Sequence, residues 1–298
     1  CCCIRRETSV IQQQGKVCNM RKHLSTILLV VILITGLSLL LYPTVSNAWN
    51  ASLQTSKIDS YVKSVVDLQN DDYKEMLQAA HAYNERLYKE KHILALSDSE
   101  RAEYESMLAV GTDGTMGYIE IPKIRCVLPI YHGTNEAVLQ SAIGHIEGSS
   151  LPVGGANTHC VLSGHRGLPS AKLFSNLDQL ETGDTFELHI LDETLTYEVD
   201  QIRIVLPEEV DDLTPQEGKD LCTLVTCTPY GVNTHRLLVR GHRVENAAAG
   251  INVRVPMDAV QVDPIMVAPI VAVPILLLLL ILLFCGGGRR TKKKEKHA

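Results

Sequence analysis

The pattern of polar and apolar positions along the chain changes its period once, near Gly111. Between residues 56 and 91, apolar side chains recur every three or four positions, which is typical of an amphipathic helix. The segment Asn70-Asp71-Asp72 interrupts this pattern and supplies a new helix cap. The apolar stripe includes tyrosines, but a stripe at helical spacing indicates packing against a core rather than a ligand site. We therefore predict an N-terminal helical layer, with a possible lid, over residues 56–110.

After Gly111 the apolar positions alternate with polar ones, as expected for β-strands with one buried face. One alternating run changes phase near Asp200-Gln201, which indicates a β-bulge. The expected strands cover residues 118–121, 127–130, 160–162, 186–190, 195–204, 224–226 and 237–239, with a short helix at 136–142. Because these strands are short and separated by Gly, Pro and Asn, we predict a mostly β fold over residues 111–246, a closed and mostly antiparallel barrel.

Two long apolar segments flank this region. The first, Leu24–Leu41, lies within residues 20–48, which fit both a cleaved signal peptide and a retained anchor. The second, residues 265–285, follows a linker at 247–264 and precedes the basic tail at 286–298. About 20 apolar residues span a bilayer, so we predict flanking transmembrane helices. Positive charge on the same side of both segments places the domain between them outside the cell membrane and the tail in the cytoplasm.

The composition, the net charge and the first residues of the chain add to this prediction. The 298 residues include 45% hydrophobic and 21% charged residues, enough for one sizeable core. The net charge of -6 gives no reason to expect nucleic acid as a partner. Residues 1–19 begin with three cysteines, whereas Met20 begins a basic-then-apolar export pattern. We interpret residues 1–19 as a non-native upstream extension.

Four of the nine cysteines fall in the exported region: Cys126, Cys160, Cys222 and Cys227. Two disulfides are one possibility outside a membrane. The spacing of these cysteines is not that of a regular disulfide framework, so we favour the first three as small buried hydrophobic residues. Paired CxxC motifs with zinc-site spacing are missing from the sequence, so no metal site and no cofactor are expected.

The candidate chemistry lies at the ends of predicted strands. Cys227 ends the run Thr223–Thr226, Arg236 begins the next strand after a Pro-Tyr-Gly turn, and His165 follows another short apolar run. A cysteine attacks carbonyl groups as the thiolate, which an imidazolium and a guanidinium both favour. Histidine also transfers protons to and from amines, and arginine presents fixed donors to an oxyanion. The three residue types together predict thiol acyl transfer.

These residues carry a resemblance to the sortase family. Thr223-Leu224-Val225-Thr226-Cys227 resembles the sortase signature Thr-Leu-x-Thr-Cys, Arg236 follows nine positions later, and Ser163–Gly167 resembles the segment with the sortase histidine. The similarity extends from residue 117 to residue 241. Pro129–Gly133, Cys227–Gly231 and the second apolar segment resemble class C, the pilus-assembling sortases of Gram-positive bacteria.

The resemblance implies a sortase-type β-barrel and a membrane-anchored transpeptidase on the extracellular face. Such an enzyme cleaves an LPxTG-like sorting signal between Thr and Gly and holds the acyl fragment as a thioester. A class C member then transfers it to a lysine amine of a pilin. On this resemblance Cys227 is the nucleophile, His165 the general acid and base, and Arg236 the oxyanion and substrate donor.

Several alternatives stay open. The acceptor could instead be the amine of a peptidoglycan precursor, as in cell-wall anchoring, and the barrel could be a catalytically dead, membrane-tethered binding module or a hydrolytic protease. Class C sortases usually place an Asp-Pro-aromatic lid before the barrel, but residues 94–100 lack it. In this segment, Asp98 has two possible roles: as part of a lid it would contact Arg236, or with Ser97 it would cap a helix. Rivals to the catalytic residues are His235, Arg240 and Arg243, while structural or surface roles are favoured for His145, His159 and His242.

Overall fold

The computed structural model describes residues 2–68, 70–90, 96–111 and 113–246, with the backbone alone for residues 2–27, 70 and 71. The predicted linker, second membrane helix and basic tail lie outside the described residues. The chain divides into two units, of which Ser46–Arg254 contains the barrel and its helices. The other unit contains the amino-terminal part of the first helix, up to Val45. Each unit is described by itself.

Three helices precede the first strand: α1 (Cys2–Asp67), α2 (Asn70–Glu90) and α3 (Asp98–Ser106). The predicted interruption near Asn70 is confirmed, because α1 ends at Asp67 and α2 begins at Asn70. Buried positions on α2 recur at helical spacing, and these are Leu77, Ala80, Tyr83 and Leu87. The expected packing role of this stripe is therefore confirmed.

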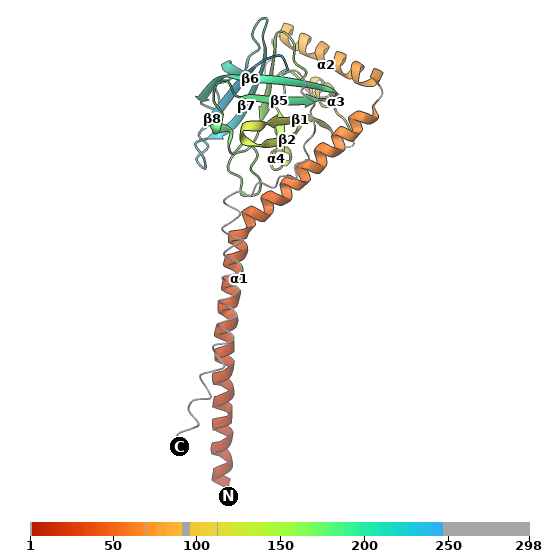
Figure 1. The fold of residues 1–298 in the computed structure, drawn as a ribbon. Helices are drawn as coiled ribbons and strands as arrows, with labels where there is room; N and C mark the ends of the chain where they lie inside the picture. Colours follow the sequence, from red (N-terminus) through yellow and green to blue (C-terminus); the bar gives the residue numbers. More distant parts are fainter. Residues whose placement is uncertain (1, 69, 91–95, 112, 247–298) are drawn as a thin grey trace. The chain divides into compact units, whose positions relative to one another are not determined.

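Eight strands form a closed barrel in the order β1-β2-β3-β4-β7-β8-β6-β5 (Figure 1). Their bounds are β1 Thr115–Ile121, β2 Cys126–His132, β3 Ile143–His145, β4 Thr158–Ser163, β5 Thr185–Ile190, β6 Glu193–Val205, β7 Asp220–Thr228 and β8 His235–Arg243. A short helix, α4 (Glu136–Leu139), and three 3-10 turns, at Pro122–Ile124, Leu177–Gln179 and Asp211–Leu213, lie in the connections. The predicted closed β-barrel with an N-terminal helical layer is confirmed.

The details of the sheet add to the prediction. The bulge is present, because the β6–β8 register shifts between Val199 and Gln201. Two of the strand pairs, β2 with β3 and β4 with β7, are parallel. The three-residue strand β3 did not stand out in the sequence because it is too short to show an alternation.

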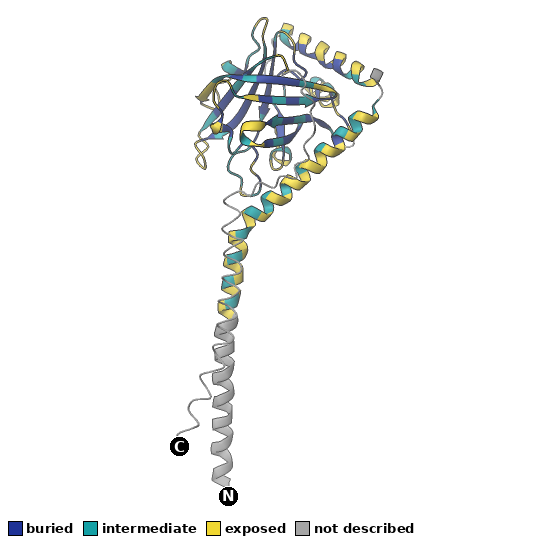
Figure 2. Cartoon of the chain, in the orientation of Figure 1, coloured by how far each residue is buried: buried dark blue, intermediate teal, exposed yellow. Residues whose placement is uncertain are grey.

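The core fills the inside of the barrel, where the strands carry buried residues (Figure 2). Along β7, Cys222 and Leu224 belong to this inner cluster, whereas Val225 belongs to a second, smaller cluster. Successive strand residues point to opposite faces, so this second cluster lies on the outer face of the sheet. Its members are Val161, Val205, Leu213, Val225 and Leu238, with Ile146 packed against them.

Hydrogen bonds from buried side chains attach α1 and α2 to the barrel. On α1, the Tyr61 hydroxyl donates to the carbonyl of Met116 and accepts from the amide of Leu191. On α2, the buried Asn84 amide forms two bonds with the backbone of Leu151, at 2.7 and 3.1 Å. Each pair of bonds satisfies backbone groups that would otherwise lack partners. Because hydrogen bonds are directional, they fix the orientation of the two helices on the barrel in addition to the apolar contacts.

The amino-terminal helix also contains an apolar segment. Within Leu28–Asp67, an 18-residue window has a mean hydropathy of 2.4, and none of this window is buried. By length and composition this helix is able to cross a membrane.

Replacing Tyr104 on α3 with phenylalanine tests the attachment of this helix. The Tyr104 hydroxyl lies 2.9 Å from Nδ1 of His145, 3.1 Å from the His145 carbonyl oxygen, and accepts from the Gly133 amide at 3.0 Å. Tyr104→Phe leaves these buried groups without this partner, so we expect the free energy of unfolding to fall by about 1–3 kcal/mol. Denaturant titration measures it.

The matched control for this experiment is Arg86→Ala. The Arg86 guanidinium on α2 forms an ion pair with Glu103 on α3, the helix that carries Tyr104, but both side chains are exposed. Exposed pairs contribute about 0–1 kcal/mol, so this change should alter the free energy of unfolding less than Tyr104→Phe does. Equal effects of the two substitutions would contradict the importance of the buried hydroxyl.

Candidate active site

The three predicted site residues lie at the ends of three adjacent strands. Cys227 on β7 is paired directly with Arg236 on β8. On the other side of β7, Ser163 on β4 is paired in parallel with Val225. His165 lies two residues beyond Ser163, and Cys227 lies two residues beyond Val225. Because the two strands run in the same direction, both residues lie at the same end of the barrel. The register therefore brings the ends that carry all three residues together.

The alternation of side chains along β7 and β8 also shows on which face of the sheet Cys227 and Arg236 lie. Val225 and Leu238 belong to the outer cluster, and Cys227 and Arg236 each lie two positions from one of them. Residues two apart on a strand share a face. Cys227 and Arg236 consequently lie on the outer face, at the edge of the outer apolar cluster. His235, the main rival histidine, is paired with Thr228 and alternates with Arg236, as expected for a residue on the opposite face.

Two hydrogen bonds tie the chain around His165 to the chain around Cys227. The hydroxyl of Thr226 donates to the carbonyl of Gly164 at 2.8 Å. The amide of Gly164 donates to the carbonyl of Val225 at 3.1 Å. These bonds continue the β4–β7 pairing past the last strand residue, so the backbone next to the histidine is held against the backbone next to the cysteine.

The turn between β7 and β8 orients the arginine. Nη1 of Arg236 donates to the carbonyls of Asn233 and His235, each at 3.2 Å. Gly231 and Asn233 adopt positive φ angles of 75° and 61°, which glycine and asparagine tolerate better than other residues. The Pro-Tyr-Gly-Val-Asn sequence thus supplies the residue types that this turn requires.

The same turn contacts the loop that follows His165. The guanidinium of Arg166 lies 5.9 Å from the centre of the Tyr230 ring, a cation–π arrangement. Gly167 has a φ of 79°, and a Cβ atom there would come within 3.0 Å of the same ring. Arg166 is also paired with Asp178. These contacts join the loops that carry the histidine and the arginine.

His165 has an acidic neighbour that the sequence did not single out. Its Nε2 atom lies 3.8 Å from Oε2 of Glu136, on α4. The His165 side chain is 29% exposed and that of Glu136 72% exposed. The sequence predicted the short helix, but nothing local links a residue on it to a histidine in a later loop. Only the folding of α4 beside the end of β4 brings the two together.

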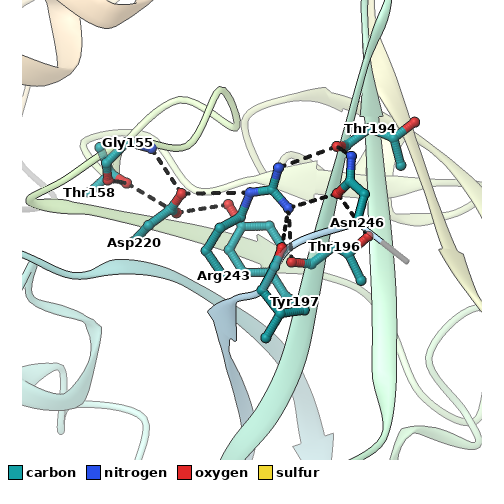
Figure 3. Close-up of polar contacts among 9 residues, drawn as sticks. Gly155, Thr158, Thr194, Thr196, Tyr197, Asp220, Arg243 and Asn246 are labelled. Carbon is teal, nitrogen blue, oxygen red and sulfur yellow. Dashed lines mark hydrogen bonds and ion pairs between the residues drawn. The ribbon is translucent and has the colours of Figure 1, made fainter. Parts of the chain in front are cut away.

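The rival arginines are occupied by acidic partners. Arg240 forms two 2.9 Å bonds with the carboxylate of Asp200. Arg243 lies in a polar network with Asp220 at the other end of β7 (Figure 3). Its guanidinium donates to the carbonyls of Thr196 and Val244 and to the side chain of Asn246, while Asp220 also accepts from the Tyr197 hydroxyl and the Gly155 amide. Both arginines hold strands together, away from Cys227.

Two further histidines, His145 and His159, have structural partners. His145 is fully buried and contacts the Tyr104 hydroxyl and, at 2.8 Å, the carbonyl oxygen of Ser150. His159 is also fully buried, and its Nδ1 and Nε2 lie 3.0 Å from the Thr214 carbonyl oxygen and 2.7 Å from the Thr223 hydroxyl. The structural roles favoured for these two residues from the sequence agree with these contacts.

The cysteines of the barrel separate into two kinds. Cys126, Cys160 and Cys222 are buried and free, while Cys227 is free and partly exposed. Burial raises the pKa of Cys126 to about 12, which disfavours its thiolate. Burial also raises the pKa of Cys222 well above its usual value. The prediction of three buried, unpaired cysteines is confirmed.

The segment expected to contain a lid is partly described. Ser97 caps α3, with the Glu100 amide donating to its hydroxyl and its own amide donating to the Glu100 carboxylate. This reciprocal arrangement is a capping box. Asp98 lies in the first turn of α3 and is exposed, so the cap interpretation of this segment is confirmed. Residues 91–95 lie outside the described part of the chain.

Comparison with known proteins adds three findings. Residues 119–244 match the sortase domain family. Sortase D of Bacillus subtilis (strain 168) is 32% identical over 151 residues, which cover 50% of this chain and 73% of that protein. The crystal structure of sortase C1 from Streptococcus agalactiae is similar with 55% identity and a TM-score of 0.63, over 64% of this chain and 100% of that one. Sortase C from Streptococcus pneumoniae is similar with 44% identity and a TM-score of 0.59, over 65% and 98%.

Thiol labelling tests the difference between the cysteines. The full-length protein in detergent micelles is treated with iodoacetamide, and modified residues are mapped by mass spectrometry. Because Cys227 is the partly exposed thiol among the described cysteines, we expect it to react at least about tenfold faster than Cys126, Cys160 or Cys222. Cys227→Ser and a denatured sample are the controls. Labelling of a buried cysteine first would contradict the assignment.

A pH titration of stability tests the buried His159. Burial lowers its pKa to about 4, whereas the unfolded chain titrates near 6.5. The unfolded state binds a proton first, so stability falls as the pH drops from 6.5 to about 4, by about 3 kcal/mol. In His159→Gln this part of the loss should be absent. Equal pH dependence of unfolding in the two proteins would show that His159 is not the responsible group.

Proposed function

Since the chain belongs to the sortase family of cysteine transpeptidases, and to its class C, we propose that it joins pilin subunits at the cell surface. In this proposal it cleaves an LPxTG-like sorting signal between Thr and Gly and transfers the acyl fragment to a lysine amine of a pilin. The observation that carries the proposal is the register of β4, β7 and β8, which gathers Cys227, His165 and Arg236 at one end of the barrel.

The proposed first half-reaction forms a thioester. The Cys227 thiolate attacks the carbonyl carbon between Thr and Gly, and the carbonyl oxygen becomes an oxyanion. Arg236 donates to this oxyanion, since a guanidinium keeps its charge and presents a planar array of donors. His165 gives a proton to the glycine nitrogen, the carbon–nitrogen bond breaks, and the glycine-containing fragment leaves as an amine.

The proposed second half-reaction releases the enzyme. A lysine amine of the acceptor attacks the thioester carbon, and His165 takes the proton that the amine loses. The carbon–sulfur bond breaks, Cys227 leaves as a thiolate, and an isopeptide bond remains. Glu136, whose Oε2 lies 3.8 Å from Nε2 of His165, is close enough to orient the imidazole during these proton transfers.

A buried apolar cluster supports the strands that carry these residues. Val225 and Leu238 form the pair two positions from Cys227 and Arg236 on the same face, and both are buried. They hold the ends of β7 and β8 in place beside the site. The sortase C from Streptococcus pneumoniae has been described with respect to pilin substrate specificity, and this similarity supports a pilin as substrate here.

A place on the outer face of the membrane completes the proposal. The apolar part of α1 is long enough to act as an anchor, and a second predicted membrane helix at residues 265–285 would leave the basic tail in the cytoplasm. One apolar segment precedes the barrel in the sequence and the other follows it, so both are in position to anchor the barrel to the membrane. Pilin polymerisation takes place outside the membrane, where the acceptor lysine and the donor signal are both present.

An acyl-transfer assay tests the reaction. The full-length protein in micelles is incubated with an LPxTG peptide, and intact-mass spectrometry follows a covalent adduct on Cys227 and its transfer to a pilin domain with accessible lysines. Cys227→Ala should form no adduct, and His165→Gln should form it far more slowly. Arg236→Lys keeps the charge but loses the planar array of donors, so we expect a roughly 10²–10³-fold slower reaction.

The identity of the amine that accepts the acyl fragment distinguishes pilin polymerisation from the alternative functions. A pilin lysine used in preference to a peptidoglycan-precursor amine supports polymerisation, and the reverse preference would support cell-wall anchoring. Release of the fragment to water alone would indicate a hydrolytic protease. A wild-type protein that forms no adduct with any LPxTG-like peptide, while Cys227 remains reactive to iodoacetamide, would leave a binding module.

A further inference from the structure

A second cluster of reactive side chains lies on the outer face of β1 and β5. Glu120 is paired directly with Glu187 across these strands, and His189 lies two residues further along β5 on the same face. One ligand atom from each residue lies within 4.8 Å of the others. In the order of the barrel, β1 and β7 are four strands apart, so this cluster lies on the other side of the barrel from Cys227.

The distances within the cluster match a metal site. Nε2 of His189 lies 3.5 Å from Oε2 of Glu187 and 3.9 Å from Oε2 of Glu120. A tetrahedral zinc ion with bonds of about 2.0–2.2 Å holds its ligand atoms roughly 3.4 Å apart. Small side-chain rotations, mainly of Glu120, would therefore bring all three atoms to coordination distance.

The imidazole of His189 is held in the orientation that such a site requires. Its Nδ1 lies 3.1 Å from the hydroxyl of Thr194. Its ring stacks on Tyr118 with centroids 4.4 Å apart and planes inclined by 12°. Metal-binding histidines commonly use the second ring nitrogen in such a bond, which fixes the ring. With Nδ1 engaged, Nε2 is the atom directed at the two carboxylates.

The charges at this position also favour a cation. Like charges placed directly opposite each other on two strands destabilise the pair. His189 is the ion-pair partner described for both carboxylates. A divalent cation would balance two carboxylates where a single imidazole cannot.

We propose that Glu120, Glu187 and His189 form a binding site for a divalent transition-metal cation of the zinc class. One nitrogen and two carboxylate oxygens are a donor set that zinc accepts, with a water molecule in the fourth position. Calcium is less suited, because it takes six to eight oxygen ligands.

The site would act as a clamp between two strands rather than in the acyl transfer. The ladder between β1 and β5 consists of three residue pairs, and two of these pairs contain the proposed ligands. Tyr118, on which His189 stacks, also contacts Tyr61 of α1 with centroids 6.5 Å apart. A bound metal would therefore stabilise the closure of the barrel next to the helical layer.

The test uses the full-length protein in detergent micelles after treatment with a chelator. Zinc chloride is titrated in, bound zinc is measured by calorimetry, and the thermal midpoint is measured by circular dichroism. The test variant is Glu187→Gln, and the matched control is Glu193→Gln, an exposed glutamate at the start of the neighbouring β6. Wild type and control should bind one more equivalent of zinc than Glu187→Gln, or bind it at least about tenfold more tightly.

Zinc should also raise the thermal midpoint of the wild type and the control, and not that of Glu187→Gln. Without zinc, Glu187→Gln should melt close to the wild type, because the substitution removes the like-charge contact with Glu120 together with the ion pair to His189 and keeps the shape of the side chain. Equal zinc binding and equal midpoint shifts in all three proteins would place the metal elsewhere, for example on the amino-terminal cysteines, and overturn the proposal. A midpoint shift with calcium chloride but none with zinc chloride would also overturn it.

Discussion

The position of β7 between β4 and β8 is the constraint on which the site depends. β7 pairs in parallel with β4 and antiparallel with β8, so the end of β4 and the start of β8 meet at the end of β7. The Thr226 hydroxyl extends this pairing to Gly164, one residue before His165. Because backbone hydrogen bonds fix the register, the relative positions of the three backbones need no contact between the reactive side chains themselves.

The charged residues that join strands elsewhere in the barrel are distinct from those near Cys227. Arg240 and Arg243 each meet an aspartate, and the Asp220 network lies at the end of β7 opposite Cys227. Cys126, Cys160 and Cys222 are buried, and burial raises the pKa of Cys126 and Cys222, which disfavours their thiolates. Cys227, the proposed nucleophile, differs from the buried cysteines by its place near a strand end, where it is partly exposed.

The helical layer is connected to the same end of the molecule. Near the start of the barrel unit, Asn47 accepts from the Lys172 amide, Asn50 donates to the Ser170 carbonyl, and Gln54 donates to the Ser141 carbonyl. Lys172 and Ser170 belong to the loop between His165 and β5, and Ser141 follows α4, which carries Glu136. The helix that leads away from the apolar segment therefore contacts both loops that surround the histidine, and its docking restricts their freedom.

The sequence by itself determined the element types, the bulge near Asp200, the break near Asn70 and the three candidate residues, because each depends on local periodicity or on a short motif. Tertiary structure alone decided that β4 and β7 pair in parallel, that Glu136 lies beside His165, and that Arg243 is occupied by Asp220. It also brought Glu120 next to Glu187 and His189. These are contacts between residues far apart in the chain, and no local pattern specifies which distant strand becomes the neighbour. Barrel closure makes that choice, since it satisfies every strand's backbone hydrogen bonds at once.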